Sequence, residues 1–152
     1  MACYLRPFVN SGPTFSDFGF PHHREKRCSH MKDPSEKSVI LVVDDDADCR
    51  EMLSDLLSNE GYLVVSAKNG RQALDYLSGS TAALIILDLM MPVMSGWEFR
   101  ARQKSDPRLE SLPVVVMTAS GLVHDIDADA VVRKPIDFGL LMSLVKQNCP
   151  PP

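Results

Sequence analysis

Short apolar runs recur along the chain from position 39 onward and are separated by longer, more polar segments. The runs are rich in β-branched residues and too short for helices, which is typical of buried strands. They are VILVV at 39–43, YLVVSA at 62–67, ALIIL at 83–87, PVVVM at 113–117 and AVV at 130–132. The pattern therefore predicts five strands.

The segments between these runs carry apolar residues at helical spacing. In the first segment, Leu53, Leu56 and Leu57 fall on one face, and Gly61 provides a stop. Helices are predicted over 47–61, 69–79, 95–105 and 137–149. Strands that alternate with helices indicate an α/β domain, in which helices cover both faces of a parallel sheet.

Polar side chains that can bind a ligand or take part in a reaction follow four of the predicted strands. The first strand runs into the acidic triplet 44–46 and the third into Asp88, while the fourth ends at Thr118 and the fifth just before Lys134. Right-handed crossovers bring the carboxyl ends of parallel strands to one edge of the sheet, where ligands bind in such folds. We therefore expect these side chains to meet in one site.

Three carboxylates at one edge repel one another, so a nearby positive charge is needed to keep all three ionised. Asp44, Asp45 and Asp88 offer the oxygen ligands that Mg²⁺ prefers. Asp88 can then attack phosphorus as a nucleophile and form an acyl phosphate, while the metal neutralises charge on the transferring group. Thr118 can donate a hydrogen bond to a phosphoryl oxygen, and Lys134 can pair with its charge.

Asp46, the third residue of the acidic triplet, has a simpler interpretation. It directly precedes the first predicted helix, where an aspartate caps the free N–H groups of the first turn. The whole triplet could likewise be a solvated turn. The polar residues that follow the other strands favour a metal site for Asp44 and Asp45 and leave the cap to Asp46. The methionines at 90, 91 and 94, near the third strand end, are expected to be packing residues.

Four segments carry a resemblance to a known family. They are VVDDD at 42–46, LDLMMPVMSG at 87–96, MTAS at 117–120 and RKP at 133–135. In this order they make the chain from about 38 to 149 similar to the receiver domain of two-component response regulators, in particular to stand-alone receivers such as chemotaxis regulators. The resemblance implies a five-stranded parallel sheet in a flavodoxin-like, doubly wound (βα)5 fold.

The resemblance also implies a role for each residue of the site. Asp88 would be the phosphoacceptor, and the donor would be a sensor histidine kinase or a histidine phosphotransfer protein. Asp45 and Asp88 would bind Mg²⁺ together with the backbone carbonyl of Met90, while Asp44 would act through a water molecule. The Lys134–Pro135 bond would be cis, as X-Pro bonds in tight turns can be.

Two features depart from the family pattern. The interval between Thr118 and Lys134 is shorter than in typical receivers by more than one helical turn (~3.6 residues), so we expect a shortened fourth helix. Val131 stands three residues before the lysine, where most members carry a switch aromatic. Both features fall on the surface that the family uses for output, so we expect activation to act through another surface or only weakly.

Residues 1–36 differ from the rest of the chain. They hold four prolines and show no period of 2 or 3.6, so we interpret them as a flexible tail, followed by a receiver domain at 37–149 and a short tail at 150–152. Translation starting at Met31 is an alternative. The first tail also holds four potential metal ligands whose spacing fits no closed zinc pattern, namely His22, His23, Cys28 and His30.

Composition narrows the class of protein. The net charge of -4 at pH 7 gives no indication of nucleic-acid binding, and no apolar run is long enough to span a bilayer. The four cysteines include no CxxC pair, which favours reduced thiols in a cytoplasm. Since no residues remain after the last predicted helix for an output domain, we expect a cytoplasmic, single-domain protein that acts on protein partners.

Three functions are compatible with these features. The first is a single-domain response regulator that accepts a phosphoryl group on Asp88 and signals through protein–protein interaction or a phosphorelay. Such a protein is not a turnover enzyme, beyond its own phosphorylation and dephosphorylation. The second, motivated by Val131 and by the short fourth helical segment, is a pseudo-receiver that acts as an interaction module without phosphorylation. The third is a Mg²⁺-dependent aspartyl phosphohydrolase of the haloacid dehalogenase type, although DDDAD at 44–48 lacks the Thr or Val of that motif.

Overall fold

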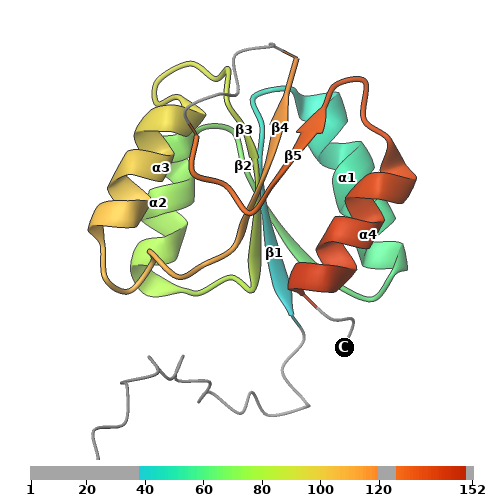
Figure 1. Ribbon diagram of the computed structural model, residues 1–152, viewed down its shortest axis with the longest axis horizontal. Helices are drawn as coiled ribbons and strands as arrows, with labels where there is room; N and C mark the ends of the chain where they lie inside the picture. Colours follow the sequence, from blue (N-terminus) through green and yellow to red (C-terminus); the bar gives the residue numbers. More distant parts are fainter. Residues whose placement is uncertain (1–37, 120–125, 150–152) are drawn as a thin grey trace, which may run out of the picture. The chain divides into compact units, whose positions relative to one another are not determined.

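The computed structural model describes residues 38–119 and 126–149 (Figure 1). Within these residues strands and helices alternate as the sequence predicts as far as β4, and β5 is the next described element. Their bounds are β1 Val39–Val43, α1 Ala47–Asn59, β2 Leu63–Ala67, α2 Gly70–Gly79, β3 Leu84–Asp88, α3 Gly96–Ser105, β4 Val114–Thr118, β5 Ala130–Arg133 and α4 Phe138–Asn148. The predicted tails, with the histidine and cysteine group of the first, lie outside the described residues.

The strands of this region form one parallel sheet in the order β2-β1-β3-β4-β5. In register, Leu41 of β1 lies beside Val65 of β2 on one side and Ile85 of β3 on the other. The chain moves outward from β1 to β2 and then reverses to β3, so the topological switch point lies between β1 and β3. Ligands bind at such a point in open α/β sheets. The predicted α/β, doubly wound fold is confirmed.

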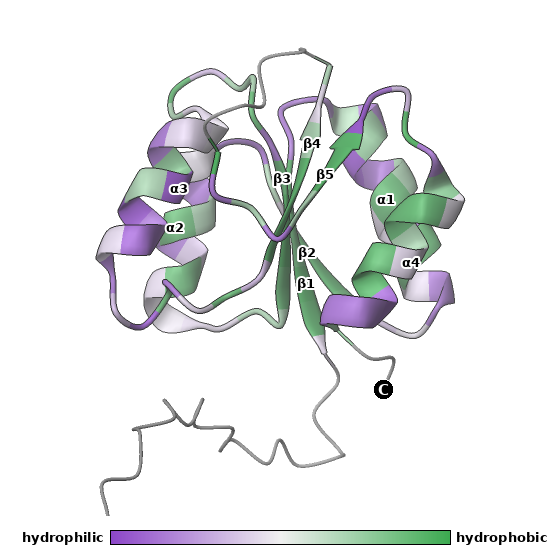
Figure 2. Ribbon diagram, viewed as in Figure 1, coloured by the Kyte–Doolittle hydropathy of each residue, from purple (hydrophilic) through white to green (hydrophobic). Residues whose placement is uncertain are grey.

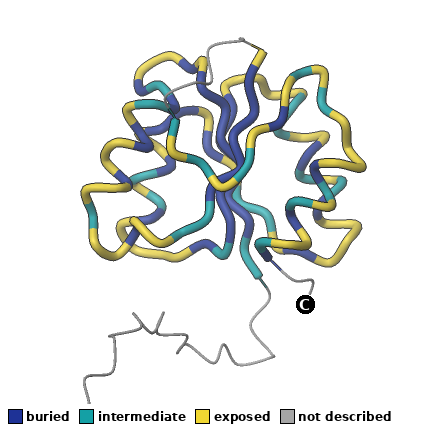
Figure 3. Tube along the Cα trace, viewed as in Figure 1, coloured by how far each residue is buried: buried dark blue, intermediate teal, exposed yellow. Residues whose placement is uncertain are grey.

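Alternating residues of each strand pack on opposite faces of the sheet. Ile40 and Val42 of β1 belong to the core under α1 and α4, whereas Leu41 and Val43 belong to the core under α2 and α3. The two pairs of helices lie on opposite sides of the sheet, and the central strands are buried between them (Figures 1 and 3). Apolar residues on both strand faces are what a sheet covered on both sides requires.

Figure 2 shows strands that are mostly apolar and helices in which apolar and polar residues are mixed. Within the described residues, no helix combines the length and the apolar character needed to cross a membrane.

Polar caps begin each of these helices at the edge where the strands end. The Asp46 carboxylate accepts hydrogen bonds from the backbone N–H groups of Asp48 and Cys49 at the start of α1, so the predicted cap is confirmed. Ser95 and Glu98 form a capping box at the start of α3. Because the caps satisfy N–H groups that lack helical partners, they fix where each helix begins relative to the strand before it.

The connection from β4 to β5 departs most from a regular βα unit. Its described part, residues 126–129, contains no helix; residues 120–125, where the predicted short fourth helix falls, lie outside the described residues. The stretch 126–129 is held against α3 instead. Arg100 Nε donates to the backbone carbonyl of Asp127, and Lys104 Nζ lies 2.7 Å from Asp127 Oδ2. Hydrogen bonds and ion pairs from side chains of α3 thus hold residues 126–129 in place, where a helix would be held by its own backbone hydrogen bonds.

Gln103 extends this network beneath α3. The side chain is fully buried, and its Oε1 accepts a hydrogen bond of 2.8 Å from Arg100 Nη1. Its Nε2 donates to the carbonyls of Leu109 and Leu112 at 3.0 and 3.1 Å, in the loop that leads to β4. A single amide therefore joins the Arg100 guanidinium to the entry of the fourth strand.

We expect Gln103→Ala to lower the free energy of unfolding by about 1–3 kcal/mol, because it leaves the Leu112 carbonyl and the buried Arg100 guanidinium without this partner. Urea denaturation measures the change. Arg102→Ala is the matched control, since Arg102 is exposed on the same helix, and its effect should stay within about 0.5 kcal/mol. Equal unfolding midpoints for the two variants would contradict the buried role of Gln103.

Candidate metal and phosphoacceptor site

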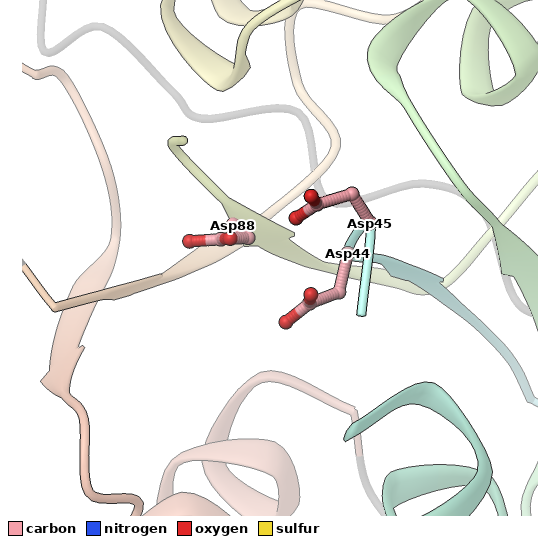
Figure 4. A group of neighbouring side chains, drawn as sticks. All are labelled: Asp44, Asp45 and Asp88. Carbon is pink, nitrogen blue, oxygen red and sulfur yellow. The ribbon is translucent and has the colours of Figure 1, made fainter. Parts of the chain in front are cut away.

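Three carboxylates converge at the carboxyl ends of β1 and β3, at the switch point of the sheet (Figure 4). One oxygen each of Asp44, Asp45 and Asp88 can be chosen so that all lie within 4.8 Å of one another. Asp44 is fully buried and Asp88 is 5% exposed, whereas Asp45 is open to solvent. The sequence prediction that these residues meet is confirmed.

The backbone at the end of β1 sets the direction of Asp44. Its N–H donates to the carbonyl of Ala67 at 3.1 Å, which extends the pairing with β2 by one step. Its Oδ1 accepts a hydrogen bond of 2.9 Å from the N–H of Asp46. The carboxylate is therefore fixed from the turn that begins α1, and its second oxygen, Oδ2, is left for the site.

Asp88 is the last residue of β3, one position beyond the predicted strand. Its Oδ1 accepts a hydrogen bond of 2.8 Å from the N–H of Leu89. Gly96, the first residue of α3, approaches the same point closely, since a Cβ built on it would lie 2.4 Å from the Asp88 carbonyl and 2.8 Å from Leu89 Cα. Only glycine lets α3 start this near the strand, so the glycine of the 87–96 segment shapes the site.

Lys134 supplies the positive charge from the end of β5. Its Nζ lies 2.8 Å from Asp44 Oδ2 and 3.4 Å from Asp88 Oδ2. Its backbone N–H donates to the Thr118 carbonyl at 2.9 Å, which ties it to β4, and the bond to Pro135 is cis as expected. The ammonium therefore bridges the two buried carboxylates.

Burial and charge act in opposite directions on the ionisable groups of the site. Burial raises the pKa of Asp88 above its ordinary value, the charge of Asp44 raises it further, and Lys134 offsets part of the shift. Burial alone would lower the pKa of Lys134, but its hydrogen bond to Asp44 and the charges of both aspartates outweigh that effect and raise it. Lys134 is therefore a permanent cation at neutral pH.

The remaining predicted residues lie around this centre. Thr118 ends β4 and is fully buried, while Val131 of β5 is 39% exposed. Of the methionines expected to pack, Met91 and Met94 are buried, but the side chain of Met90 is 62% exposed, so that expectation is wrong for it. Its predicted metal contact uses the backbone carbonyl and stays a prediction.

Two residues of α1 touch the site without having been singled out from the sequence. Arg50 Nη1 donates a hydrogen bond of 2.7 Å to the Asp44 carbonyl. Cys49 interacts with the Asp44 carboxylate and opens onto a groove of about 320 Å³ beside Lys134. Both residues lie in the first turns of the helix that follows the acidic triplet. Helical side chains point back toward the N-terminus of their helix, so this position could have predicted that they lie near the strand end.

The donor set suits a hard divalent cation. Among the described residues, two buried carboxylates and one exposed carboxylate face the Lys134 ammonium, so negative charge remains in excess at this partly exposed site. Mg²⁺ binds through one or two carboxylates while keeping several waters, and the exposure of Asp45 leaves room for them. Asp44, Asp45 and Asp88 are therefore the residues that fit the ion.

Cys49 should react slowly in the folded protein. Burial, followed by the hydrogen bond and charge of Asp44, raises the pKa of Cys49 to about 12. At pH 8 the reactive thiolate is then rare, whereas a free cysteine with a pKa of about 8.5 is partly ionised.

We expect iodoacetamide to alkylate Cys49 at least about a hundredfold more slowly in the folded chain than in urea, as read by mass spectrometry of the Cys49 peptide. Cys49 is partly buried at the wall of the groove, so its slow reaction reflects low ionisation together with this partial burial. Similar rates in both states would rule out the raised pKa.

Comparison with known proteins places the chain in a family. The model of the response regulator receiver domain matches residues 40–146. A 14.6 kDa protein of Leptolyngbya boryana is 37% identical over 116 residues, which cover 72% of this chain and 88% of that protein. Response regulator Rre1 of Synechocystis sp. is 36% identical over 119 residues, covering 74% of this chain but 52% of that protein. The chain thus spans about half the length of Rre1, and likewise of response regulator RR06 of Streptococcus pneumoniae, of which it covers 51%.

Solved structures agree with the assignment. The response regulator TrrA of Thermotoga maritima, in complex with Mg²⁺-BeF, superposes with a TM-score of 0.66 at 33% identity, covering 72% of this chain and 97% of that one. The chemotaxis protein CheY4 of Vibrio cholerae superposes with a TM-score of 0.69 at 27% identity, covering 74% and 99%. The sequence motifs, the sheet topology and the acidic site lead to the same conclusion: the chain belongs to the response regulator receiver domain family.

Proposed function

We propose that this chain accepts a phosphoryl group from a phosphohistidine on a sensor histidine kinase or a histidine phosphotransfer protein, and that Asp88 is the acceptor. The observation that carries the proposal is the placement of Asp88 among Asp44, Asp45 and Lys134, with carboxylate oxygens within 4.8 Å and the ammonium 3.4 Å away. Receiver domains as a family accept phosphoryl groups and bind Mg²⁺ at an acidic pocket, which supports it.

The chemistry needs a carboxylate oriented for attack. The N–H of Leu89 holds Asp88 Oδ1, which leaves Oδ2 on the side of Lys134. Oδ2 forms the bond to phosphorus while the P–N bond of phosphohistidine breaks, and its electron pair stays on the imidazole, which then takes up a proton. Bound Mg²⁺ would neutralise charge on the phosphoryl oxygens.

Other residues of the chain serve the same transfer. Lys134 pairs with a phosphoryl oxygen once the group is attached, exchanging part of its contact with Asp88 for the new charge. Thr118, at the end of the adjacent strand, donates a hydrogen bond to the same group. Asp44, Asp45, Asp88 and the Met90 carbonyl would hold the metal. On this proposal the chain is a phosphoacceptor and not a turnover enzyme, and it signals through protein partners.

A second candidate, an interaction module that does not use phosphorylation, is favoured by one feature. The half-exposed Val131 replaces an aromatic, and the described part of the β4–β5 connection has no helix. The two candidates differ in whether the acceptor chemistry takes place. Family membership favours both over the aspartyl phosphohydrolase that the acidic triplet alone left open.

The proposal predicts one phosphoryl group per chain after incubation with acetyl phosphate and Mg²⁺, read by intact mass. Asp88→Asn keeps the shape of the side chain but removes the nucleophile, so this variant should gain none. Asp55→Asn, an exposed change on α1, is the control and should behave like the unaltered chain. Phosphoryl gain by the Asp88→Asn variant would refute the acceptor assignment, and no gain by the unaltered chain would favour the second candidate.

Mg²⁺ should raise the melting temperature, because an ion that binds only the folded state stabilises that state. At a Mg²⁺ concentration a hundred times the dissociation constant, the free energy of unfolding rises by about 2.7 kcal/mol. Asp45→Ala should abolish this rise while leaving the metal-free melting temperature nearly unchanged, since Asp45 is exposed. Asp55→Asn should keep the rise. A rise that survives Asp45→Ala would remove Asp45 from the metal site.

A further inference from the structure

Arg50 connects the body of α1 to the backbone at the acidic strand end. Its Nη1 donates to the Asp44 carbonyl at 2.7 Å, short for an N–H···O bond and strengthened by the guanidinium charge. The backbone N–H of Arg50 donates to the Asp46 carbonyl at 3.1 Å, and its own carbonyl accepts from Ser54 Oγ at 2.7 Å. The side chain thus reaches back from a firmly held helical turn.

The Asp44 carbonyl lies beyond the end of the sheet ladder. β1 pairs with both of its neighbours only as far as Val43. Asp44 is fully buried, so a carbonyl at this position without a donor would carry a desolvation cost. Arg50 supplies the donor that the neighbouring strands do not provide.

This hydrogen bond acts on the peptide that joins Asp44 to Asp45. A peptide unit is planar, so fixing its carbonyl also fixes the direction in which the chain enters Asp45. Asp44 is held at its other polar atoms by Ala67, Asp46 and Lys134. Arg50 completes the set, and Asp45, which is exposed, takes its direction from the backbone that Arg50 holds.

We propose that Arg50 is a positioning residue: it locks the Asp44–Asp45 peptide so that the Asp45 carboxylate faces Asp44 and Asp88 before a divalent cation arrives. The inference rests on the proposed function for the identity of that cation, Mg²⁺. Asp45 then loses less conformational entropy on binding the ion, because its carboxylate is already near the position that the ion requires.

Charge and geometry make opposite predictions for Arg50, which gives a decisive test. A guanidinium near an acidic pocket repels Mg²⁺, so a purely electrostatic role means that removing it tightens Mg²⁺ binding. A positioning role means that removing it weakens binding despite the gain in negative charge. Loss of a group that orients metal ligands typically weakens metal affinity by about 10- to 100-fold.

The experiment compares Arg50→Met, Arg50→Lys and Lys68→Met with the unaltered chain by calorimetric titration with MgCl2 at constant ionic strength. Lys68 is exposed just after β2, at the same edge of the sheet, so Lys68→Met removes an equal charge without touching Asp44. We expect about tenfold weaker Mg²⁺ binding for Arg50→Met and an intermediate value for Arg50→Lys, which keeps the charge and one donor. Lys68→Met should bind as tightly as the unaltered chain or more tightly.

A second readout needs no metal. The N–H of Asp46 donates to Asp44 Oδ1, so hydrogen exchange at this amide reports how firmly the turn is held. Exchange should be faster in Arg50→Met and unchanged in Lys68→Met, with urea midpoints showing that both variants are folded.

Unchanged or tighter Mg²⁺ binding by Arg50→Met overturns the inference, whatever the exchange rates show. If the unaltered chain binds no Mg²⁺, the proposed function fails on its own. The exchange of the Asp46 amide then decides whether Arg50 holds the turn: faster exchange in Arg50→Met supports the positioning role, and unchanged exchange overturns it.

Discussion

The ion pair between the fully buried Asp44 carboxylate and the partly exposed Lys134 ammonium is the interaction around which the rest of the site is arranged. It joins residues 90 positions apart in sequence, at a distance of 2.8 Å, from β1 near the centre of the sheet to β5 at its edge. Removing charges from water is costly, and a buried pair seldom stabilises a fold more than apolar residues would. The pair is better understood as serving ligand binding: its desolvation lowers the stability of the fold, but it keeps the carboxylates and the ammonium in position for a ligand. The fully buried strands β3 and β4, which lie between the two partners, offset that cost.

The sequence was sufficient wherever a periodic pattern and a chain reversal decide the geometry. Four site residues lie at or just after the carboxyl end of an apolar strand, namely Asp44, Asp88, Thr118 and Lys134. In a parallel sheet with right-handed crossovers, these ends all lie at the same edge. The Asp46 cap was predictable for a similar reason, since an aspartate directly before a helix has nearby N–H groups to accept from. These predictions needed the order of the elements and no knowledge of side-chain packing.

Apart from Cys49, the residues that sequence reasoning missed are long polar side chains on helices. Arg50, Arg100 and Gln103 would normally lie in solvent, and their spacing does not distinguish them from surface residues. Each of them donates to backbone carbonyls outside the regular strands and helices: Arg50 to Asp44, Arg100 to Asp127, and Gln103 to Leu109 and Leu112. The need for these donors arises only once the fold exists. Met90 was misjudged for the opposite reason: an apolar residue in a loop beside a site can stay exposed.

The network on α3 also limits how a change at Asp88 can spread to the outer strand. β5 is tied to β4 at both ends, by the hydrogen bonds of Lys134 to Thr118 and of Asp129 to Val114, and the stretch before it is tied to α3 through Asp127. A modification shifts a conformational equilibrium only as far as it interacts differently with the two states. In an ordinary receiver, an aromatic ring that changes place gives the outer strand two such states. Here that position is Val131, which has a single stiff side-chain torsion. Val131 has no ring to exchange, and the stretch before β5 is held by the buried Arg100 side chain at the Asp127 carbonyl as well as by the exposed ion pair with Lys104.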